Sequence, residues 1–462
     1  MKKVILTIII LLGTFIRIIL LLQNRSFWWD ETANFEVSQH SVSAILSGDY
    51  YLFPNHPWFY YLILKTVSLI SLKEIYLRLP SVISGIMLIY IIFLLTKAII
   101  GNTKIALLAG FLYSISAYQV FHSIHAKENE IIVLFNLISL LYYFYFVKHN
   151  GKIFLFIHLF FLYLSLVTSY FTFWYLFILL FINLYYFREK IFREKIKRLM
   201  SGYFIVCLFF FPWLYLLLQK YGSAVSLLLF LQKPHFSELI NSLNMYFGYK
   251  PLVYYNIPLI FIAILAFILL KKYPQFVKNL LLFWLFYPLI AAYIISLVYR
   301  PMFIDHHMIL SSIALYIILA TVIHKYKRWG IIIIFFFLFS NIKNNRQELI
   351  SPTVEDWRSV TKEIFLHQNI NSRDYIIVDD RQAFNYYVNF HLKPEIKPDI
   401  FYLTWEDEAK KDTIINLTKK YVEEGRKVCL AATFISFNDI KLTSLNITGN
   451  TDLYPQVLCL EK

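Results

Sequence analysis

Long apolar runs recur along most of the 462-residue chain and are separated by short polar connections. A helix of about 20 apolar residues crosses the roughly 30 Å hydrocarbon core of a bilayer, and runs near this length predict transmembrane helices. The pattern therefore predicts an α-helical multi-pass membrane protein with about eleven spans. The expected spans are residues 4–22, 79–100, 105–122, 130–147, 152–168, 170–187, 200–220, 255–270, 279–299, 305–323 and 330–341.

One further apolar segment, residues 57–72, is short and carries Lys65 near its middle. If this segment does not span and the N-terminus is cytoplasmic, every strongly basic connection falls on the cytoplasmic side, as the positive-inside rule requires. A crossing at 57–72 would place the later basic clusters outside. We therefore expect 57–72 to lie along the membrane interface, which makes residues 23–78 one extracytoplasmic loop.

From about Lys343 the pattern changes to short apolar stretches between polar, charged segments. Residues 374–380 and 427–433 are typical of buried strands, and residues 383–390 and 406–424 of helices. This alternation predicts a small α/β domain over residues 343–462 with a partly parallel sheet, after a transmembrane module over residues 1–342. An odd number of spans places this domain outside the cytoplasm.

Composition supports a membrane protein, because 59% of the residues are hydrophobic and only 16% are charged, with a mean hydropathy of +0.58. The net charge of +15 comes from connections between apolar runs, which argues against a nucleic-acid partner. Residues 4–22 are long and lack a cleavage site, so we expect an uncleaved signal anchor in the cell membrane. Cys429 and Cys459 could pair outside the cytoplasm or remain two buried thiols.

The candidate chemistry begins in the first loop, where Asp30 and Glu31 follow Trp28 and Trp29. Asp30 is suited to cap a helix that starts at Glu31. It is equally suited to act as a general base at the lipid–water boundary. Both roles are compatible, because a carboxylate that caps a helix is also held rigidly.

Other polar residues are expected on the same membrane face. His56 precedes Pro57 at the start of the interfacial helix, and Arg78 precedes a span as either an anchor or a phosphate ligand. Two more groups lie at the outer ends of spans: one contains His122, His125, Lys127 and Glu128, and the other contains Arg300, Asp305, His306 and His307. Ionisable residues gathered at one membrane face indicate a functional site. The two histidines of the first group are too few to predict a metal.

A carboxylate facing several cations suits a reaction in which a hydroxyl is deprotonated while an anionic group departs. The motifs WWDE (28–31), NHPWFYYLILK (55–65), YLRLPS (76–81) and KAIIGNTKIALLAG (97–110) resemble, in that order, the N-terminal module of GT-C fold glycosyltransferases. The sequence is most similar to the protein O-mannosyltransferase and aminoarabinose transferase group. Those enzymes use polyprenyl- or dolichyl-phosphate sugars on the extracytoplasmic face.

The resemblance implies roles for individual residues. The family's catalytic acid falls on Asp30, with Glu31 beside it. The family's Arg-Leu-Pro is intact at Arg78, whereas Trp58 replaces the second proline of His-Pro-Pro after His56. Two departures weaken the match at the expected phosphate site: Glu-Ala-Arg becomes His125-Ala126-Lys127, and a late Arg-Tyr becomes His306-His307.

The expected function is therefore transfer of a sugar from a polyprenyl-phosphate donor to an extracytoplasmic protein, lipid or glycan. Asp30 would be the base, Arg78, Lys127 and Arg300 would neutralise the lipid phosphate, and His56 and Glu128 would orient or bind. A single displacement would invert the anomeric carbon. No cofactor is required, although a divalent metal could bind the acidic, histidine-lined mouth. The alternatives are a ligase or polymerase with a diphosphate-linked donor, and a transporter or flippase for a lipid-linked solute.

Overall fold

The protein is described by a computed structural model that covers residues 1–462 apart from 51–55, 188–191, 221–232, 249–252, 300–302, 351–354, 379, 393, 403–417, 419, 432–445, 451–454 and 462. The chain forms two compact units. The helical unit comprises Met1–Gln23, His40–Thr66 and Leu77–Pro352, and the C-terminal unit comprises Asn24–Gln39, Val67–Tyr76 and Thr353–Lys462. Two pieces of the first loop therefore belong to the C-terminal unit.

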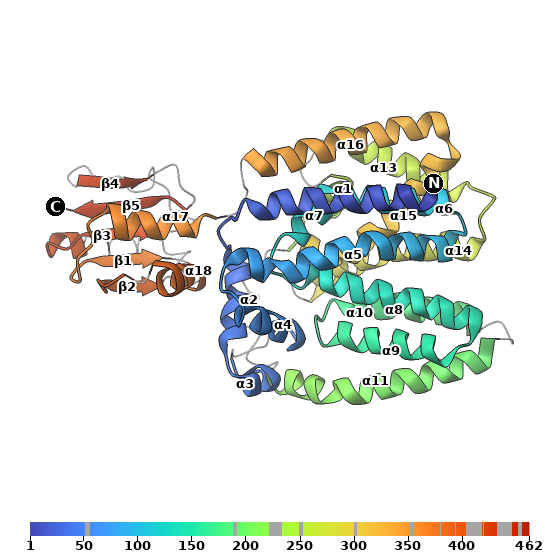
Figure 1. The fold of residues 1–462 in the computed structure, drawn as a ribbon, viewed down its shortest axis with the longest axis horizontal. Helices are drawn as coiled ribbons and strands as arrows, with labels where there is room; N and C mark the ends of the chain where they lie inside the picture. Colours follow the sequence, from blue (N-terminus) through green and yellow to red (C-terminus); the bar gives the residue numbers. More distant parts are fainter. Residues whose placement is uncertain are drawn as a thin grey trace. The chain divides into compact units, whose positions relative to one another are not determined.

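The helical unit is an all-helical bundle (Figure 1). The described residues contain helices at all eleven positions where spans were expected. The helices are α1 (Lys2–Leu22), α3 (Val42–Ser47), α4 (Phe59–Ser68), α5 (Glu74–Ile100), α6 (Thr103–Ile115), α7 (Ala117–Ser123), α8 (Asn129–His149), α9 (Lys152–Leu166), α10 (Thr172–Phe187), α11 (Arg193–Lys220), α12 (Phe236–Phe247), α13 (Val253–Ile268), α14 (Gln275–Val298), α15 (Ile309–Lys325) and α16 (Lys327–Ile350).

Six helices of the described residues are long and apolar enough to cross a membrane: α1, α5, α8, α11, α14 and α15 with its preceding turn. A seventh span exists if α6 and α7 are counted as one bent helix, and α9, α10 and part of α13 are apolar but shorter. The predicted class, a helical multi-pass membrane protein with a small C-terminal α/β domain, is confirmed. Helix α4 has ten residues, which is about 15 Å at the usual rise per residue, and this is half of a bilayer core.

Helix ends follow the local sequence. Helix α5 gives way at Gly101, whose φ of 72° favours glycine, and the Asn102 side chain then accepts hydrogen bonds from the first amides of α6. Asn150 ends α8 with a φ of 57°, and Gly151 starts α9, so α8 and α9 pack as a hairpin. The predicted boundary at residues 342 and 343 lies inside α16, which continues to Ile350.

A sharp bend of 62° separates α6 from α7. Ser116 lies at the break, where its hydroxyl caps α7 and is 2.8 Å from the Tyr316 hydroxyl. Asn341 of α16 accepts a hydrogen bond from the Ala117 amide at 2.6 Å. The backbone groups released by the bend are thus satisfied inside the bundle, as the membrane interior demands. The bend sets the direction of α7 and of the loop after it, which contains His125, Lys127 and Glu128.

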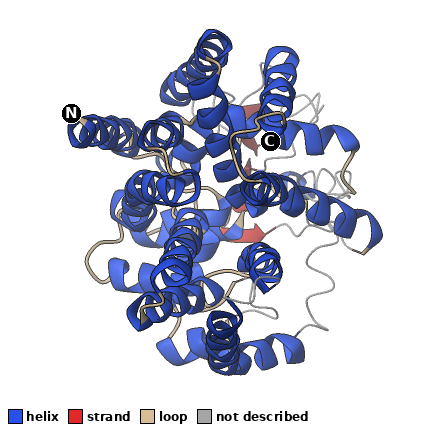
Figure 2. Cartoon of the chain, turned by 90° about the vertical axis from the view of Figure 1, so that its right-hand side faces the viewer, coloured by secondary structure: helices blue, strands red, loops and turns tan. Residues whose placement is uncertain are grey.

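Helix α15 is the centre of the bundle, and most of its side chains are fully buried. It packs against α6, α13, α14 and α16. Figure 2 shows many helices of the bundle nearly along their axes. Trp284 of α14 donates to the Leu310 carbonyl at 2.9 Å, and the Tyr246 hydroxyl of α12 donates to the Met308 carbonyl at 3.0 Å. These bonds fix the N-terminal end of α15, which follows directly after His306 and His307.

One charged network lies inside the bundle. The Arg17 guanidinium of α1 is fully buried, donates to the Gly13 and Ser114 carbonyls, and lies 5.3 Å from the centre of the Tyr113 ring. The Tyr113 hydroxyl donates to the Glu130 carboxylate at 2.6 Å. Tyr113 therefore lies between the buried Arg17 guanidinium and the buried Glu130 carboxyl group, and the network joins α1, α6 and α8.

Replacing Glu130 with Gln should lower the free energy of unfolding by about 1.5–3 kcal/mol, because the buried Tyr113 hydroxyl loses a carboxylate acceptor. Thermal unfolding in detergent measures this loss. Glu194→Gln is the matched control, since Glu194 pairs with Lys197 on the exposed surface. The double variant Arg17→Leu/Glu130→Leu should recover part of the stability. An unfolding temperature of Glu130→Gln equal to that of Glu194→Gln would show that the network stabilises nothing.

The C-terminal unit is built on a five-stranded sheet in the order β2-β1-β3-β5-β4. Strand β1 pairs in parallel with β2 and β3, whereas β5 pairs antiparallel with β3 and β4, so the predicted partly parallel sheet is confirmed. The elements of this unit are α2 (Trp29–Gln39), α17 (Trp357–Lys362), α18 (Arg381–Tyr386), β1 (Tyr375–Val378), β2 (Asp399–Tyr402), β3 (Val428–Ala431), β4 (Asn446–Asn450) and β5 (Val457–Glu461). Most of the helix predicted at 406–424 lies outside the described residues.

Cys429 of β3 and Cys459 of β5 stand directly opposite each other in the antiparallel ladder and form a disulfide, with Cα atoms 4.0 Å apart. The bond links the parallel half of the sheet to its antiparallel hairpin. Of the two alternatives that the sequence left open for these cysteines, the structure has the paired one. Disulfides persist in oxidising compartments, which agrees with an extracytoplasmic domain.

Replacing Cys429 with Ser should destabilise the C-terminal unit by about 3–4 kcal/mol, because the disulfide closes a loop of 30 residues in the unfolded chain. Limited proteolysis in increasing urea measures this change on the full chain. Cys207→Ser serves as control, since Cys207 is an exposed free thiol. Equal protease resistance of the two variants would contradict the prediction.

Candidate functional site

The acid pair lies at the start of α2 in the C-terminal unit. Helix α2 begins at Trp29, two residues earlier than expected, so Asp30 lies within its first turn and is not the capping residue. The Trp28 carbonyl accepts hydrogen bonds from the Glu31 and Thr32 amides. Glu31 is fully buried, whereas Asp30 is only half-buried. Asp30 is therefore the more accessible carboxylate of the two, and the positive end of α2 favours its charge.

In the helical unit, His56 is paired with Glu128. The His56 Nε2 atom lies 3.2 Å from the Glu128 carboxylate, and its Nδ1 atom lies 3.4 Å from the Ser169 hydroxyl. Glu128 is almost completely buried, so its main described partner is this imidazole. The sequence analysis expected both His56 and Glu128 to orient or bind substrate, and the structure pairs them with each other.

Lys127 meets the start of α15. Its Nζ atom is 3.4 Å from the His306 Nε2 atom, and the His306 ring lies 6.1 Å from the His122 ring. The Asn129 Nδ2 atom lies 3.4 Å from the His122 Nδ1 atom. We define the His–Lys cluster as His56, His122, Lys127, Glu128, His306 and His307. Residues that lie up to 251 positions apart, from His56 to His307, are thus gathered within one unit.

Arg78 lies on α5, which contacts the loop that carries Lys127. One turn after Arg78, the Ser81 hydroxyl of α5 donates to the Lys127 carbonyl at 2.7 Å. Positions three apart share a face of a helix, so Arg78 lies on the α5 face that meets the Lys127 loop. Arg78 itself is buried, with 3% of its surface exposed. The guanidinium and the ammonium therefore belong to neighbouring elements, in keeping with a shared anionic ligand.

The loop between α9 and α10 completes the cluster and was not singled out in the sequence. Ser169 contacts His56, and Phe171 stacks on His307 with ring centres 3.8 Å apart. Phe171 also contacts the His56 ring edge-on at 5.9 Å. The signal that could have found this loop is topological: the span pattern predicted from the sequence places the connection between the spans 152–168 and 170–187 on the same membrane face as the first loop.

The two remaining predicted site residues are His125 and Arg300. The His125 Nδ1 atom lies 2.6 Å from the Phe121 carbonyl, so the ring caps the last turn of α7, a usual role for histidine at a helix C-terminus. Arg300 lies outside the described residues. The predicted cationic contribution of Arg300 therefore remains a prediction.

The cluster contains buried polar atoms with unused hydrogen-bonding capacity. Within the described part of the chain, the His122 Nε2 and Glu128 Oε2 atoms are buried and have no hydrogen-bond partner. Such atoms cost free energy unless water or a ligand satisfies them. The described residues include no group of three His, Cys, Asp or Glu side chains that could hold a metal ion. The arrangement is thus suited to bind a polar ligand through one ammonium, imidazole rings and one carboxylate.

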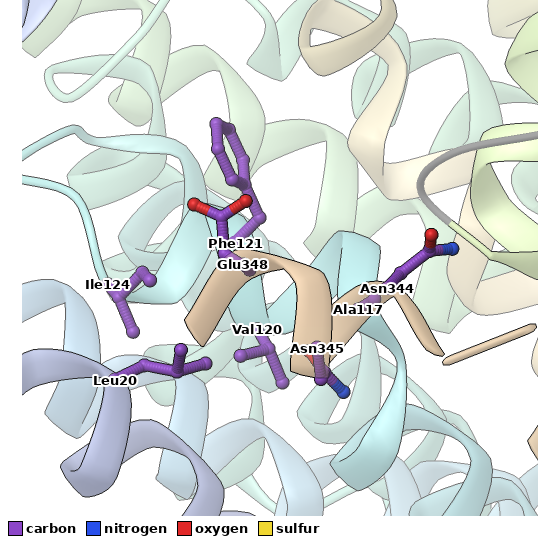
Figure 3. Close-up of a pocket in the computed structure, with 8 residues that line it drawn as sticks. All are labelled: Leu20, Ala117, Val120, Phe121, Ile124, Asn344, Asn345 and Glu348. Carbon is purple, nitrogen blue, oxygen red and sulfur yellow. The ribbon is translucent and has the colours of Figure 1, made fainter. Parts of the chain in front are cut away.

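A separate small pocket adjoins another face of α7 (Figure 3). Its walls come from α1, α7, α16 and the residue after α7, and are lined by Leu20, Ala117, Val120, Phe121, Ile124, Asn344, Asn345 and Glu348. The positions 117, 120, 121 and 124 follow helical spacing on one face, whereas His122 lies on another. The pocket therefore belongs to the packing between α7 and its neighbours and is distinct from the His–Lys cluster.

No protein-family model matches the sequence, and no curated protein matches it either. Solved structures do share its fold. ArnT from Cupriavidus metallidurans, in a crystal structure bound to undecaprenyl phosphate, is similar with a TM-score of 0.59 and 11% sequence identity over 99% of this chain and 97% of that one. The oligosaccharyltransferase of Archaeoglobus fulgidus has a TM-score of 0.53 and 13% identity, over 83% of this chain and 63% of that one.

The arabinofuranosyltransferase AftD from Mycobacteria is a third structure of the same fold, with a TM-score of 0.53 and 11% identity. The match covers 100% of this chain and 39% of the AftD chain. The chain therefore has the GT-C fold, and the resemblance expected from its motifs is confirmed for the fold.

Proposed function

We propose that the protein is an integral-membrane glycosyltransferase that moves a sugar from a polyprenyl-phosphate donor to an extracytoplasmic acceptor. Since one fold hosts many functions, the fold alone does not carry this proposal. The observation that carries it is the buried Lys127 beside His306, near the Arg78 face of α5, in a chain whose fold matches a protein solved with a lipid phosphate.

The cations suit the leaving group. When the bond between the anomeric carbon and the phosphate oxygen breaks, the bonding electron pair stays on the phosphate, whose negative charge increases. Fixed cations in a site of low dielectric stabilise this charge without a general acid. Lys127 and Arg78 are assigned this role, with His306 as a hydrogen-bond donor and Arg300 as a further cation.

The acceptor needs a base. A hydroxyl attacks the anomeric carbon more readily when a carboxylate removes its proton, and Asp30 is assigned this role because it is the more accessible member of the pair. Glu31, which is buried, is assigned to support Asp30. His56 and Glu128 are assigned to orient the substrates. One displacement inverts the configuration of the transferred sugar.

A second candidate uses a diphosphate-linked donor, and the likeness to an archaeal oligosaccharyltransferase favours including it. The two candidates differ in the group that the cations must hold. A diphosphate carries one more phosphoryl group and calls for more cations or a metal ion. We prefer the monophosphate because the fold matches that of a protein solved with undecaprenyl phosphate, which carries a single phosphate group.

Native mass spectrometry of the purified protein tests the donor class. The protein should retain or bind a polyprenyl-phosphate sugar, and a polyprenyl-diphosphate sugar of the same chain length should compete poorly. Preferential binding of the diphosphate would support the second candidate. Binding of neither lipid would contradict both.

A further inference from the structure

In the C-terminal unit, Arg358 and Tyr387 hold the segment that carries Asp30 and Glu31, and we call these two residues the clamp. Three stretches that are distant in sequence fold together in it: Asn24–Gln39 with α2, Val67–Tyr76, and Thr353–Lys462 with the sheet. The first two stretches come from the first loop. The domain therefore provides the packing partner of α2 within this unit.

Arg358 of α17 holds the chain that leads into α2. Its Nη1 atom donates to the Asn24 carbonyl at 2.8 Å, and its backbone amide donates to the Ser26 hydroxyl at 3.1 Å. The same guanidinium forms an ion pair with Glu74, whose side chain is 2% exposed. One side chain of the C-terminal domain thus binds both pieces of the first loop.

Tyr387 makes a second link between the same partners. Its hydroxyl accepts a hydrogen bond from the Phe27 amide at 2.6 Å and donates to Glu74 at 3.0 Å. Burial, and to a lesser degree the charge of Glu74, raises the pKa of Tyr387, so the hydroxyl keeps its proton and can donate. A buried hydrogen bond to a charged group is among the strong ones.

The C-terminal half of α2 is held by aromatic contacts of Phe35. Phe35 meets the Tyr386 and Phe390 rings edge-on, with ring centres 4.9 and 5.3 Å apart, and the Tyr386 hydroxyl donates to the Leu72 carbonyl at 2.7 Å. Edge-on aromatic pairs contribute about 0.5–1.5 kcal/mol beyond the buried area. Helix α2 is thus fixed before its first turn by Arg358 and Tyr387, and after it by Phe35.

We propose that Arg358 and Tyr387 are positioning residues for the Asp30 carboxylate. This inference rests on the proposed function, in which Asp30 is the base. Asp30 lies three residues after Phe27, so the entry of the chain into α2 determines where its carboxylate lies. A displacement of about 1 Å can lower a rate by 10²-fold, and a looser entry to α2 therefore costs turnover without altering donor binding.

Tyr387→Phe tests this role with the loss of a single oxygen atom. The expected result is a kcat about tenfold lower, because the misplaced base reacts more slowly, with an unchanged KM for the polyprenyl-phosphate sugar. Tyr402→Phe is the matched control, since the Tyr402 hydroxyl donates to Asn385 within the same unit. Equal kcat values for Tyr387→Phe and the wild type would overturn the proposal.

A combination with Asp30→Asn separates positioning from general damage. If Tyr387 acts through Asp30, Tyr387→Phe should lower the residual rate of Asp30→Asn no further. If Tyr387→Phe only damaged the protein in general, it would lower kcat by the same tenfold in the wild-type and in the Asp30→Asn protein. That result would overturn the proposal.

Hydrogen exchange of the full chain tests the clamp without any activity. The Phe27 amide should exchange faster in Tyr387→Phe than in Tyr402→Phe, and Arg358→Gln should show the same increase relative to Arg426→Gln, whose native partner is Asp399. Faster exchange in both variants would support the clamp whether or not the wild-type protein is active. An inactive wild-type protein would reject only the proposed function. Unchanged exchange would reject the clamp.

Discussion

Replacing Asp30 with Asn should lower the rate of sugar transfer by about 10²–10⁴-fold, the usual contribution of a positioned general base. Asparagine keeps the size of the side chain and the hydrogen-bond acceptor but cannot take the proton of the acceptor hydroxyl. Binding of the lipid-linked donor should be unchanged, because the cations assigned to the phosphate lie on other elements. The measurement is the initial rate with a radiolabelled polyprenyl-phosphate sugar.

The matched control for this change is Glu31→Gln. Glu31 neighbours Asp30 in the same turn of α2 but is fully buried, so its replacement should have a milder effect on the rate. The assignment of the base fails if Asp30→Asn retains full transfer in a correctly inserted protein. A larger loss in Glu31→Gln than in Asp30→Asn would assign the base to Glu31.

Replacing Lys127 with Met should weaken donor binding by about 10- to 100-fold, since a hydrogen bond to a charged group contributes about 1.5–3 kcal/mol. Methionine keeps the apolar stem of lysine and removes only the ammonium. The change should appear in the dissociation constant of the donor and also in kcat, because the phosphate gains charge in the transition state. Titration with polyprenyl phosphate measures the binding part.

Lys148→Met is the control at the opposite end of α8 from the Lys127 loop. Lys148 lies in the last turn of α8 and is exposed, so its loss should leave the dissociation constant unchanged. Equal affinities of Lys127→Met and Lys148→Met would remove Lys127 from the phosphate site. Arg78 would then be the next candidate for the phosphate ligand.

The helices could be predicted from the sequence because the bilayer constrains them strongly. Backbone groups in lipid must be paired within the segment, so an apolar run of sufficient length has few alternatives to a helix. The ends were less predictable: α9 ends at Leu166 and α16 continues to Ile350, since caps and packing decide these positions. The bend at Ser116 was also missed, because its cause is a set of tertiary hydrogen bonds.

The candidate site was predictable in composition but not in pairing. The structure brings together several of the polar residues that the sequence places at the ends of spans, yet nothing local indicates that Glu128 meets His56 and not Lys127. Buried partners are chosen by packing between helices that are distant in sequence. Glu74 is a second example. In the sequence it is an ordinary acid in the first turn of a helix, but in the structure it pairs with Arg358 at a separation of 284 residues.

Arg17 shows the opposite failure, since it was visible but not interpreted. A single arginine within an apolar run does not prevent the prediction of a span. Its energetic meaning depends on the Tyr113 hydroxyl and the Glu130 carboxylate, which are contributed by two other helices. A charge inside a predicted span is therefore better treated from the outset as evidence for a buried partner.

The most direct test of the account is the release of free polyprenyl phosphate when the purified protein acts on a polyprenyl-phosphate sugar, with a native membrane fraction as the source of acceptor. The account predicts that wild-type protein releases one polyprenyl phosphate for each sugar incorporated, and that Asp30→Asn protein releases about 10²–10⁴-fold less per unit time. A wild-type protein that binds the donor and leaves it intact under these conditions would contradict the account.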